Sequence, residues 1–287
     1  MNRRTFLAVG MVAAVASPGR AAKIDDVPSY LQEISVTIRA GGSEGSGIAF
    51  VRDGTTYVWT AAHVVAGNRK TRKVVAGGTP KTLVEFDDVQ CVKMLSESGR
   101  IVGMLAIDAE VVRYSDADNG HDLALLRVRK KGFLTRSAAF YLDPKIPKLG
   151  VPLWHCGSLL GSSGAGSVTS GILSAHGRLI RGSKFIYDQA TVVAFPGSSG
   201  GAVTLADGRV VGMLVRGTSV QGFNLIVPIR RWRKWAADAG VLWAIDPAAK
   251  MPTAKQLDEL PIEDNGGKSP GTGGAMKAFP FLIRRVR

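Results

Sequence analysis

The stretch Phe195-Pro-Gly-Ser-Ser-Gly-Gly-Ala202 combines glycine and serine in an order that suits a nucleophilic serine. Within it, Gly197-Ser-Ser199-Gly-Gly would let the Ser199 hydroxyl attack a carbonyl carbon while nearby backbone N–H groups hold the resulting oxyanion. Glycine permits the tight turn that aims two amides at one point. Such a stretch between apolar segments is also typical of an ordinary flexible turn. The interpretation therefore depends on what the rest of the sequence supplies.

Two upstream stretches supply the partners that a reactive serine needs. Val58-Trp-Thr-Ala-Ala-His63 ends a run of strand-forming residues with a histidine, and Asp122 opens an apolar run over 123–128. A serine hydroxyl is a poor nucleophile at neutral pH, so it needs a base and a carboxylate that orients this base. We predict a triad of Ser199 as nucleophile, His63 as general base and then acid, and Asp122 as the orienting carboxylate.

These motifs resemble, in this order, the signature blocks of trypsin- and chymotrypsin-like serine proteases. Gly45-Ser-Gly-Ile-Ala-Phe50 and Ser167-Val-Thr-Ser-Gly-Ile-Leu-Ser-Ala175 are similar to the bacterial Deg-like (HtrA) branch, and the likeness covers about residues 30–245. It implies an all-β fold of two six-stranded antiparallel barrels with a C-terminal helix. It also implies a serine endopeptidase that acts through an acyl-enzyme and needs no cofactor.

The resemblance also assigns individual roles. The family's attacking serine directly precedes Gly-Gly, which selects Ser199 over its neighbour Ser198. The backbone amides of Gly197 and Ser199 are then expected to form the oxyanion hole. Asp122 is preferred among nearby acids because it alone immediately precedes the apolar strand. The remaining histidines have no metal-ligand spacing, so we expect no metal site.

A specificity pocket follows from the same likeness. Val193, six residues before Ser199, matches the base of the pocket, where enzymes that cleave after lysine or arginine carry an acid. Gly217 and Gly222 match its walls. We therefore expect an open, apolar pocket and cleavage after small or medium hydrophobic residues.

Val215-Arg216-Gly217 matches the edge that binds the substrate backbone as an added strand. Val215 stands where chymotrypsin has a serine that supports the aspartate. Arg216 replaces an aromatic or small polar residue and would favour acidic groups in the substrate. These departures bear on efficiency and specificity rather than on the class of reaction.

Residues 1–22 have the anatomy of a signal peptide. Arg3-Arg4 precede a short apolar run over 6–16, and small residues follow at the end of this run. The run is too short for a comfortable membrane span. Asn2-Arg-Arg-Thr-Phe-Leu7 also resembles a twin-arginine signal. We expect export, by the general or the twin-arginine route, to the periplasm or the medium.

The rest of the chain is expected to contain one protease domain over 23–245 and a tail. Its first barrel would occupy about 30–128, its second about 151–229, and its C-terminal helix about 228–240. Residues 246–287 are rich in proline, glycine and basic residues, which predicts a flexible tail. This tail is too short for the PDZ domain that many Deg-like proteases carry.

Two further stretches carry local predictions. Apolar and polar residues alternate over 31–39, which predicts a strand. Residues 68–81 are basic and contain glycine, which predicts a surface loop.

The two cysteines, Cys91 and Cys156, lie far apart in the sequence. Export would bring them to an oxidising compartment, where a disulfide could link the two barrels. The alternative is a pair of buried thiols that pack as small hydrophobic groups. The sequence leaves both open, because it does not give the distance between them.

The formal net charge of +14 raises the question of an anionic partner. Lysine and arginine are spread over loops, helix and tail, mostly without interleaved aromatic residues, which argues against a specific nucleic-acid partner. Solvated basic faces explain the charge most simply, and weak contact of the tail with an anionic surface is the alternative.

Polypeptides are the expected substrates, and no residue of the sequence requires an oligomer. A second functional hypothesis is a catalytically inactive, protease-like module that binds extended peptides.

Overall fold

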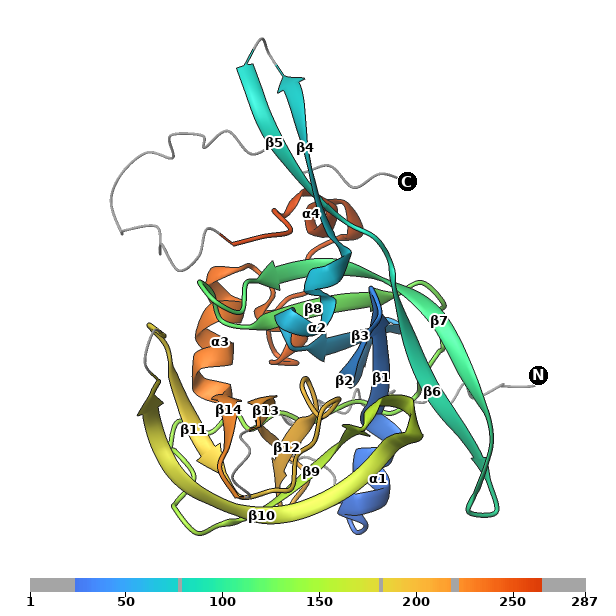
Figure 1. Ribbon diagram of the computed structural model, residues 1–287, viewed down its shortest axis with the longest axis vertical. Coiled ribbons are helices and arrows are strands. Elements are labelled where there is room, and N and C mark those ends of the chain that lie inside the picture. Colours follow the sequence, from blue (N-terminus) through green and yellow to red (C-terminus); the bar gives the residue numbers. More distant parts are fainter. Residues whose placement is uncertain (1–23, 77–78, 181–182, 218–221, 265–287) are drawn as a thin grey trace, which may run out of the picture.

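The computed structural model describes residues 24–76, 79–180, 183–217 and 222–264. Within these ranges most strands close into two six-stranded antiparallel barrels, which lie one above the other in Figure 1. This confirms the fold class predicted from the sequence. The signal peptide predicted over residues 1–22 lies outside the described residues.

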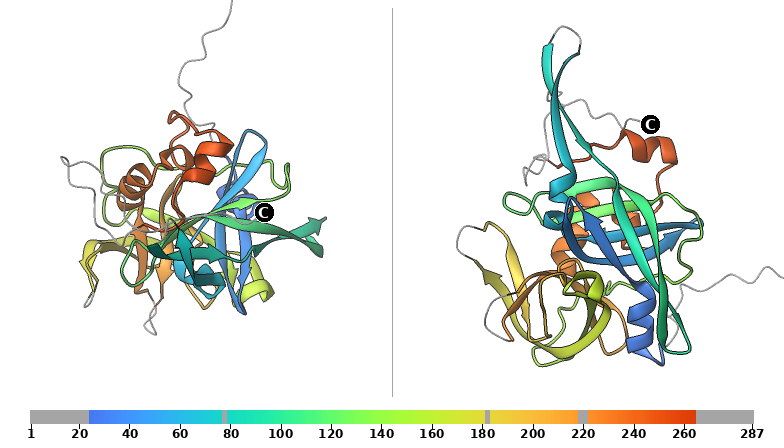
Figure 2. Two further views of the ribbon diagram at one scale, coloured as in Figure 1. Left: turned by 90° about the horizontal axis from the view of Figure 1, so that it is seen from above. Right: turned by 45° about the vertical axis from the view of Figure 1, so that its right-hand side comes forward.

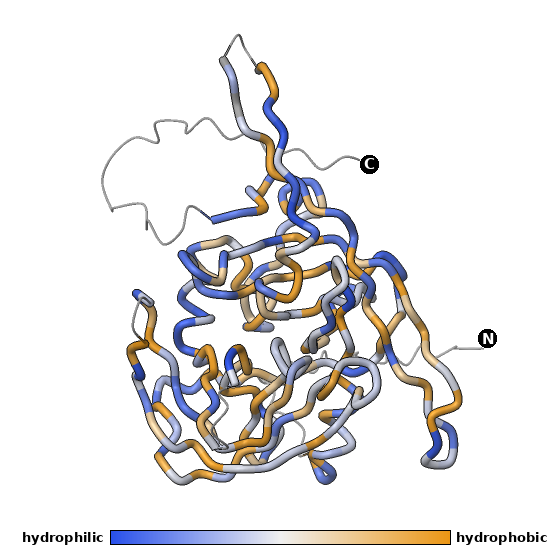
Figure 3. Tube along the Cα trace, in the orientation of Figure 1, coloured by the Kyte–Doolittle hydropathy of each residue, from blue (hydrophilic) through white to orange (hydrophobic). Residues whose placement is uncertain are grey.

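The first barrel is closed by β1, which pairs with β2 on one side and with β6 on the other. Around it the strands run in the order β1 (Ser35–Ala40), β2 (Ser43–Arg52), β3 (Thr55–Thr60), β8 (Leu123–Val128), β7 (Arg100–Ser115) and β6 (Val89–Glu97). Ile48, Phe50 and Trp59 of β2 and β3 belong to the hydrophobic core and are at most 1% exposed. Figure 3 shows hydrophobic segments within the barrels and a hydrophilic tip on the β6–β7 hairpin.

The second barrel is closed by β9, which pairs with both β10 and β12. Its strands run in the order β10 (Gly164–Leu179), β11 (Ile186–Ala190), β14 (Asn224–Pro228), β13 (Val210–Arg216), β12 (Ala202–Leu205) and β9 (Pro152–Leu159). An extended segment over 129–151 connects the two barrels without a helix or long strand.

The helices are short. They are α1 (Val27–Ile34), α2 (Ala62–Val65), α3 (Ile229–Asp238), α4 (Ala254–Glu259) and three 3-10 turns, η1 (Ala66–Asn68), η2 (Gly161–Ser163) and η3 (Leu242–Ala244). In the described part of the chain, no helix has the length and apolar character needed to cross a bilayer.

Helix α3 follows the second barrel in the sequence but packs on the first barrel. The ring of Trp232 in α3 lies 5.1 Å from the ring of Trp59 in β3. This contact stabilises the arrangement of the two barrels.

Helix α1 occupies the first part of the stretch predicted as a strand over 31–39. Asp26 caps it by accepting the Ser29 N–H at 3.1 Å, and Pro28 lies in its first turn. Its apolar residues also recur at helical spacing and are buried: Val27, Tyr30, Leu31 and Ile34. The extended conformation begins only at Ser35.

The segment predicted as a surface loop over 68–81 instead belongs to a hairpin of β4 (Arg69–Ala76) and β5 (Thr79–Phe86). This hairpin projects from the first barrel in Figure 1 and in the right-hand view of Figure 2. Arg72 and Glu85 pair across it at 3.1 Å. A ribbon with much of its surface in solvent shows little apolar alternation, which is why its sequence resembled a loop.

The chain between residues 246 and 264 packs on the first barrel, which differs from the flexible tail predicted from residue 246. Leu257 of α4 is fully buried and Ile262 is 4% exposed. The Ile262 carbonyl accepts the Tyr114 N–H at 2.7 Å, and Asp258 pairs with Arg127 at 3.1 Å. The folded part of the domain therefore extends to residue 264. The rest of the predicted tail, 265–287, lies outside the described residues.

Cys91 in β6 and Cys156 in β9 are free thiols, and both are buried. The structure thus has two separate thiols in place of the disulfide that the sequence left open. Burial raises the pKa of Cys156 to about 11 and raises that of Cys91 as well. Both sulfurs consequently stay protonated and pack as apolar groups.

The packing of α4 can be tested by truncating its buried side chain. Replacing Leu257 with alanine should lower the free energy of unfolding by about 2–5 kcal/mol, because it opens a cavity under the helix. Urea denaturation measures this. The control Glu259→Ala changes an exposed residue of the same helix and should cost much less. Equal, small effects of both substitutions would contradict the packing.

Candidate active site

His63 and Asp122 come together because they flank neighbouring antiparallel strands. His63 follows the end of β3, and Asp122 precedes the start of β8, where Thr60 pairs with Ala124. The Asp122 carboxylate lies 3.0 and 3.1 Å from His63 Nδ1, and it also accepts the His63 backbone N–H at 3.1 Å. Because a carboxylate only accepts hydrogen bonds, this contact favours the tautomer with the proton on Nδ1. Nε2 is then left as the basic nitrogen.

Asp122 itself is 1% exposed and has a left-handed backbone conformation, with φ of 57°. Aspartate tolerates this conformation better than most residues do. Its backbone N–H donates to the Asp116 carbonyl at 3.2 Å, and Arg231 of α3 donates to the carbonyl of the preceding His121 at 2.6 Å. The turn before β8 and helix α3 therefore set the orientation of the carboxylate.

Ser199 lies in a loop of two successive turns that leads into β12. Hydrogen bonds from the Ser198 N–H to the Phe195 carbonyl, 2.9 Å, and from the Gly201 N–H to the Ser198 carbonyl, 3.0 Å, close the two turns. Gly197 and Gly200 occupy the third position of each turn with φ of 93° and 90°. This is the glycine position of a type II turn, and Pro196 occupies the favoured second position of the first.

Two amides of this loop remain available for a ligand. Over residues 195–201, Pro196 has no N–H, and every other backbone N–H except those of Gly197 and Ser199 has a hydrogen-bond acceptor within the described residues. The amides without an acceptor are the same two that the sequence assigned to the oxyanion hole. An oxyanion bound to them would satisfy both donors.

The Ser199 loop also contacts the segment that carries His63. A Cβ atom placed on Gly45 would lie 2.5 Å from Val64 and 3.1 Å from the Ser199 carbonyl oxygen, so only glycine lets the two approach. The Ser199 hydroxyl donates to the Val215 carbonyl at 3.4 Å. In the described structure it makes no hydrogen bond with the His63 ring. Catalytic hydrogen bonds are often long without substrate and shorten in the complex.

Ser46 of β2, a residue that no predicted site included, joins the two barrels at this point. Its N–H donates to the Ser199 carbonyl and its hydroxyl donates to the Gly197 carbonyl, each at 2.7 Å. The same hydroxyl accepts the Ser158 N–H, and the Ser46 carbonyl accepts the Thr60 hydroxyl, again each at 2.7 Å. In the sequence, the one feature that marks Ser46 is its position between Gly45 and Gly47, in the stretch that resembles the Deg-like branch.

The residues predicted to form the specificity pocket lie on neighbouring segments. Val193 follows β11 and is 43% exposed. A Cβ atom on Gly217 would lie 3.9 Å from that of Ala194, and one on Gly222 would lie 3.9 Å from Thr191. Both glycines therefore face the chain around Val193. Their assignment to a substrate pocket stays a prediction.

The predicted backbone-binding edge is at the end of β13. Val215 is 3% exposed, and its carbonyl accepts the Ser199 hydroxyl, whereas Arg216 is exposed. Strand β13 has an irregular register with β14 between Leu214 and Arg216.

Two other histidines have structural environments. His155 of β9 is fully buried, and its Nδ1 lies 2.9 Å from the Ala202 carbonyl. The ring of His121 packs 4.3 Å from that of Phe185. Burial lowers the pKa of each histidine to about 4, so both rings are neutral at pH 7. In the described part of the chain, no three histidine, cysteine or acidic residues gather as metal ligands do.

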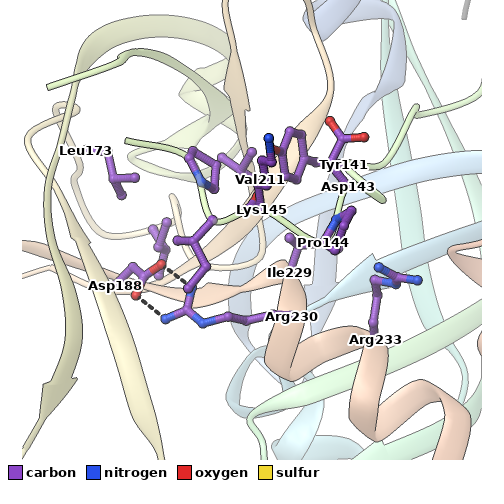
Figure 4. Close-up of a pocket in the computed structure, with 13 residues that line it drawn as sticks. Tyr141, Asp143, Pro144, Lys145, Leu173, Asp188, Val211, Ile229, Arg230 and Arg233 are labelled. Carbon is purple, nitrogen blue, oxygen red and sulfur yellow. Dashed lines mark hydrogen bonds and ion pairs between the residues drawn. The ribbon is translucent and has the colours of Figure 1, made fainter. Parts of the chain in front are cut away.

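A separate pocket lies on the second barrel, between the connecting segment and α3 (Figure 4). Asp188 and Arg230 face each other there through two hydrogen bonds of 2.6 Å. Ile146, Leu173 and Ile229 contribute apolar walls. No residue of the predicted triad lines this pocket, so it is distinct from the candidate active site.

Two closed antiparallel barrels, with a histidine–carboxylate pair and a glycine-rich serine loop where they meet, define the chymotrypsin-like class of fold. Solved structures agree. The serine endoprotease from Yersinia pestis matches with a TM-score of 0.53 and 18% identity, over 77% of this chain and 68% of the other. Deg5 matches with a TM-score of 0.52 and 19% identity, over 77% and 94%.

Sequence comparisons identify the family. The model of the trypsin-like peptidase domain matches residues 45–213, and the chain belongs to this family. It is 31% identical over 197 residues to the serine protease Do-like HtrA of Lactobacillus helveticus and 30% identical over 202 residues to that of Lactococcus lactis. Each match covers 65% of this chain but 40% and 42% of the relative, so the chain spans about two fifths of their length. The predicted resemblance is confirmed.

The contribution of Ser46 to holding the serine loop can be tested by measuring the free energy of unfolding of a variant. Replacing Ser46 with alanine removes the bond to Gly197 and leaves the buried Ser158 N–H without an acceptor. The free energy of unfolding should fall by about 1–3 kcal/mol, measured by urea denaturation. Ser43→Ala, at an exposed position of the same strand, is the control and should have little effect. An unchanged stability of the Ser46 variant would contradict this role.

Proposed function

We propose that the protein is an exported serine endopeptidase that hydrolyses peptide bonds through Ser199, His63 and Asp122. The observation that carries the proposal is the Asp122 carboxylate, which accepts hydrogen bonds from both Nδ1 and the backbone N–H of His63. The two amides of the Ser199 loop that have no acceptor among the described residues give it independent support.

In the proposed reaction, Ser199 Oγ attacks the substrate carbonyl carbon while His63 Nε2 takes its proton. The tetrahedral oxyanion receives hydrogen bonds from the Gly197 and Ser199 N–H groups. Asp122 stabilises the imidazolium that forms. His63 then returns the proton to the leaving amine, and a water molecule repeats the sequence to release the acyl group.

We further propose that the substrate is a polypeptide with a small or medium hydrophobic side chain before the cleaved bond. Val193 in place of an acid, and Gly217 and Gly222 opposite it, support an apolar and open pocket. The exposed Arg216 would favour an acidic group elsewhere in the substrate. Export rests on the composition of residues 1–22, which predicts a periplasmic or secreted protein.

One observation favours the alternative of a peptide-binding module without turnover. The Ser199 hydroxyl points to the Val215 carbonyl at 3.4 Å rather than to the His63 ring. A scaffold that remained in this state would bind an extended peptide along β13 without attacking it.

Covalent labelling distinguishes these two functions. A fluorophosphonate probe should label the wild-type protein at Ser199, because an activated serine attacks its phosphorus atom. The variant Ser199→Ala should not be labelled, whereas Ser198→Ala should still react. Mass spectrometry of the labelled peptide locates the adduct. A folded wild-type protein that is not labelled would favour the peptide-binding module.

The role of Asp122 predicts a specific kinetic loss. In Asp122→Asn, the amide would donate to His63 Nδ1 and favour the wrong tautomer, so kcat should fall by about 10⁴-fold. Steady-state cleavage of a peptide substrate measures this. Asp118→Asn, which changes an acid in the preceding turn, should retain most activity. Loss of activity in Asp118→Asn with a fully active Asp122→Asn would reverse our assignment.

A further inference from the structure

The orientation of one peptide bond decides whether the Gly197 amide can serve the oxyanion hole. The Pro196 carbonyl accepts a hydrogen bond from the Leu160 N–H at 2.7 Å. This peptide bond is trans, so the Gly197 N–H points away from Leu160. Because glycine also populates other turn conformations, the peptide could rotate if the Leu160 contact were lost.

The position of the Leu160 N–H depends on an unfavourable backbone conformation of Leu160. Leu160 has φ of 61° and Gly161 has φ of 70°, so both lie in the left-handed region. For leucine this conformation costs about 1–2 kcal/mol. The Leu160 side chain is 64% exposed and therefore gains little from packing. Contacts made by the residues that follow Leu160 therefore have to stabilise this turn.

Glu44 of β2 supplies that support from the first barrel. Its carboxylate accepts both the backbone N–H and the hydroxyl of Ser162, each at 2.7 Å. Arg39, its partner across β1 and β2, donates to the same carboxylate at 2.7 Å and to the Ser162 hydroxyl at 2.8 Å. Three side chains thus form a closed set of hydrogen bonds two residues after Leu160.

These bonds differ from an ordinary surface ion pair. An exposed pair is worth about 0–1 kcal/mol, and Glu44 is one-third exposed. Here, however, the carboxylate also accepts a backbone N–H, so it fixes the position of the chain as well as that of an arginine. The Ser162 hydroxyl also lowers the pKa of Glu44, which keeps the group ionised at neutral pH.

We propose that Glu44 is a positioning residue for the oxyanion hole, acting through Ser162 and Leu160 on the Pro196–Gly197 peptide. The inference deepens the proposed function and rests on it. Without the carboxylate, the Leu160 turn relaxes, the Pro196 carbonyl loses its donor, and the peptide rotates. The Gly197 N–H then turns away from the position of the oxyanion. The triad residues are not contacted by Glu44, so substrate binding should be largely retained.

The variant Glu44→Gln tests this, because it keeps the size of the side chain and removes its charge. We expect kcat for a peptide substrate to fall at least about tenfold, since one oxyanion donor is worth more than that. KM should change by less than about threefold. Affinity for a peptide boronic acid, which places an oxygen in the hole, should fall with kcat. Ser162→Ala should show the same pattern while the Arg39–Glu44 pair remains.

Glu85→Gln is the matched control, because it removes a similar arginine partner on the β4–β5 hairpin. It should leave kcat and boronic acid affinity at the wild-type level. Unchanged kcat in Glu44→Gln, or an equal loss in Glu85→Gln, would overturn the proposal.

A crystal structure of the Glu44→Gln protein separates this inference from the proposed function. We expect the Pro196 carbonyl to leave the Leu160 N–H, whether or not the wild-type protein cleaves peptides. If that hydrogen bond persists unchanged, Glu44 does not position the hole. A wild-type protein that fluorophosphonate fails to label would instead contradict the endopeptidase proposal alone.

Discussion

The candidate site depends on one buried carboxylate at the junction of two strands. Asp122 is 1% exposed and accepts hydrogen bonds from both the ring and the backbone of His63. A buried charge without such partners would cost several kcal/mol. The antiparallel pairing of β3 and β8 brings these two residues close together, because it places the end of one strand beside the start of the other. The barrel thereby fixes the base of the proposed reaction.

The second barrel contributes the proposed nucleophile, and the contact between the barrels brings the loop of Ser199 close to the segment that carries His63. Gly45 allows the segment after His63 and the Ser199 loop to approach, and Ser46 holds that loop by two hydrogen bonds. The packing of Trp232 on Trp59 secures the same interface at α3. The first barrel thus supports both halves of the site, and Glu44 extends this support to the neighbouring turn.

The fold could be predicted from the sequence because the motifs around His63, Asp122 and Ser199 follow one another in the order of the family that they resemble. That resemblance implied the two barrels as well as the candidate residues. Prediction from the sequence failed where the structure depends on contacts between residues that lie far apart in the chain. Leu257 and Ile262 anchor the segment after residue 246, although the polar residues around them resembled a flexible tail. The Glu44–Ser162 contact joins residues 118 positions apart, and no local pattern marks such a pair.

The most direct test is a crystal structure of the wild-type protein inhibited by a peptide boronic acid. Our account predicts a bond from boron to Ser199 Oγ, with one boronate oxygen within about 3 Å of the Gly197 and Ser199 nitrogens. His63 Nε2 should lie within hydrogen-bonding distance of the adduct and retain its contact with Asp122 through Nδ1. An adduct on another residue, or a Ser199 adduct with His63 turned away from it, would contradict the account.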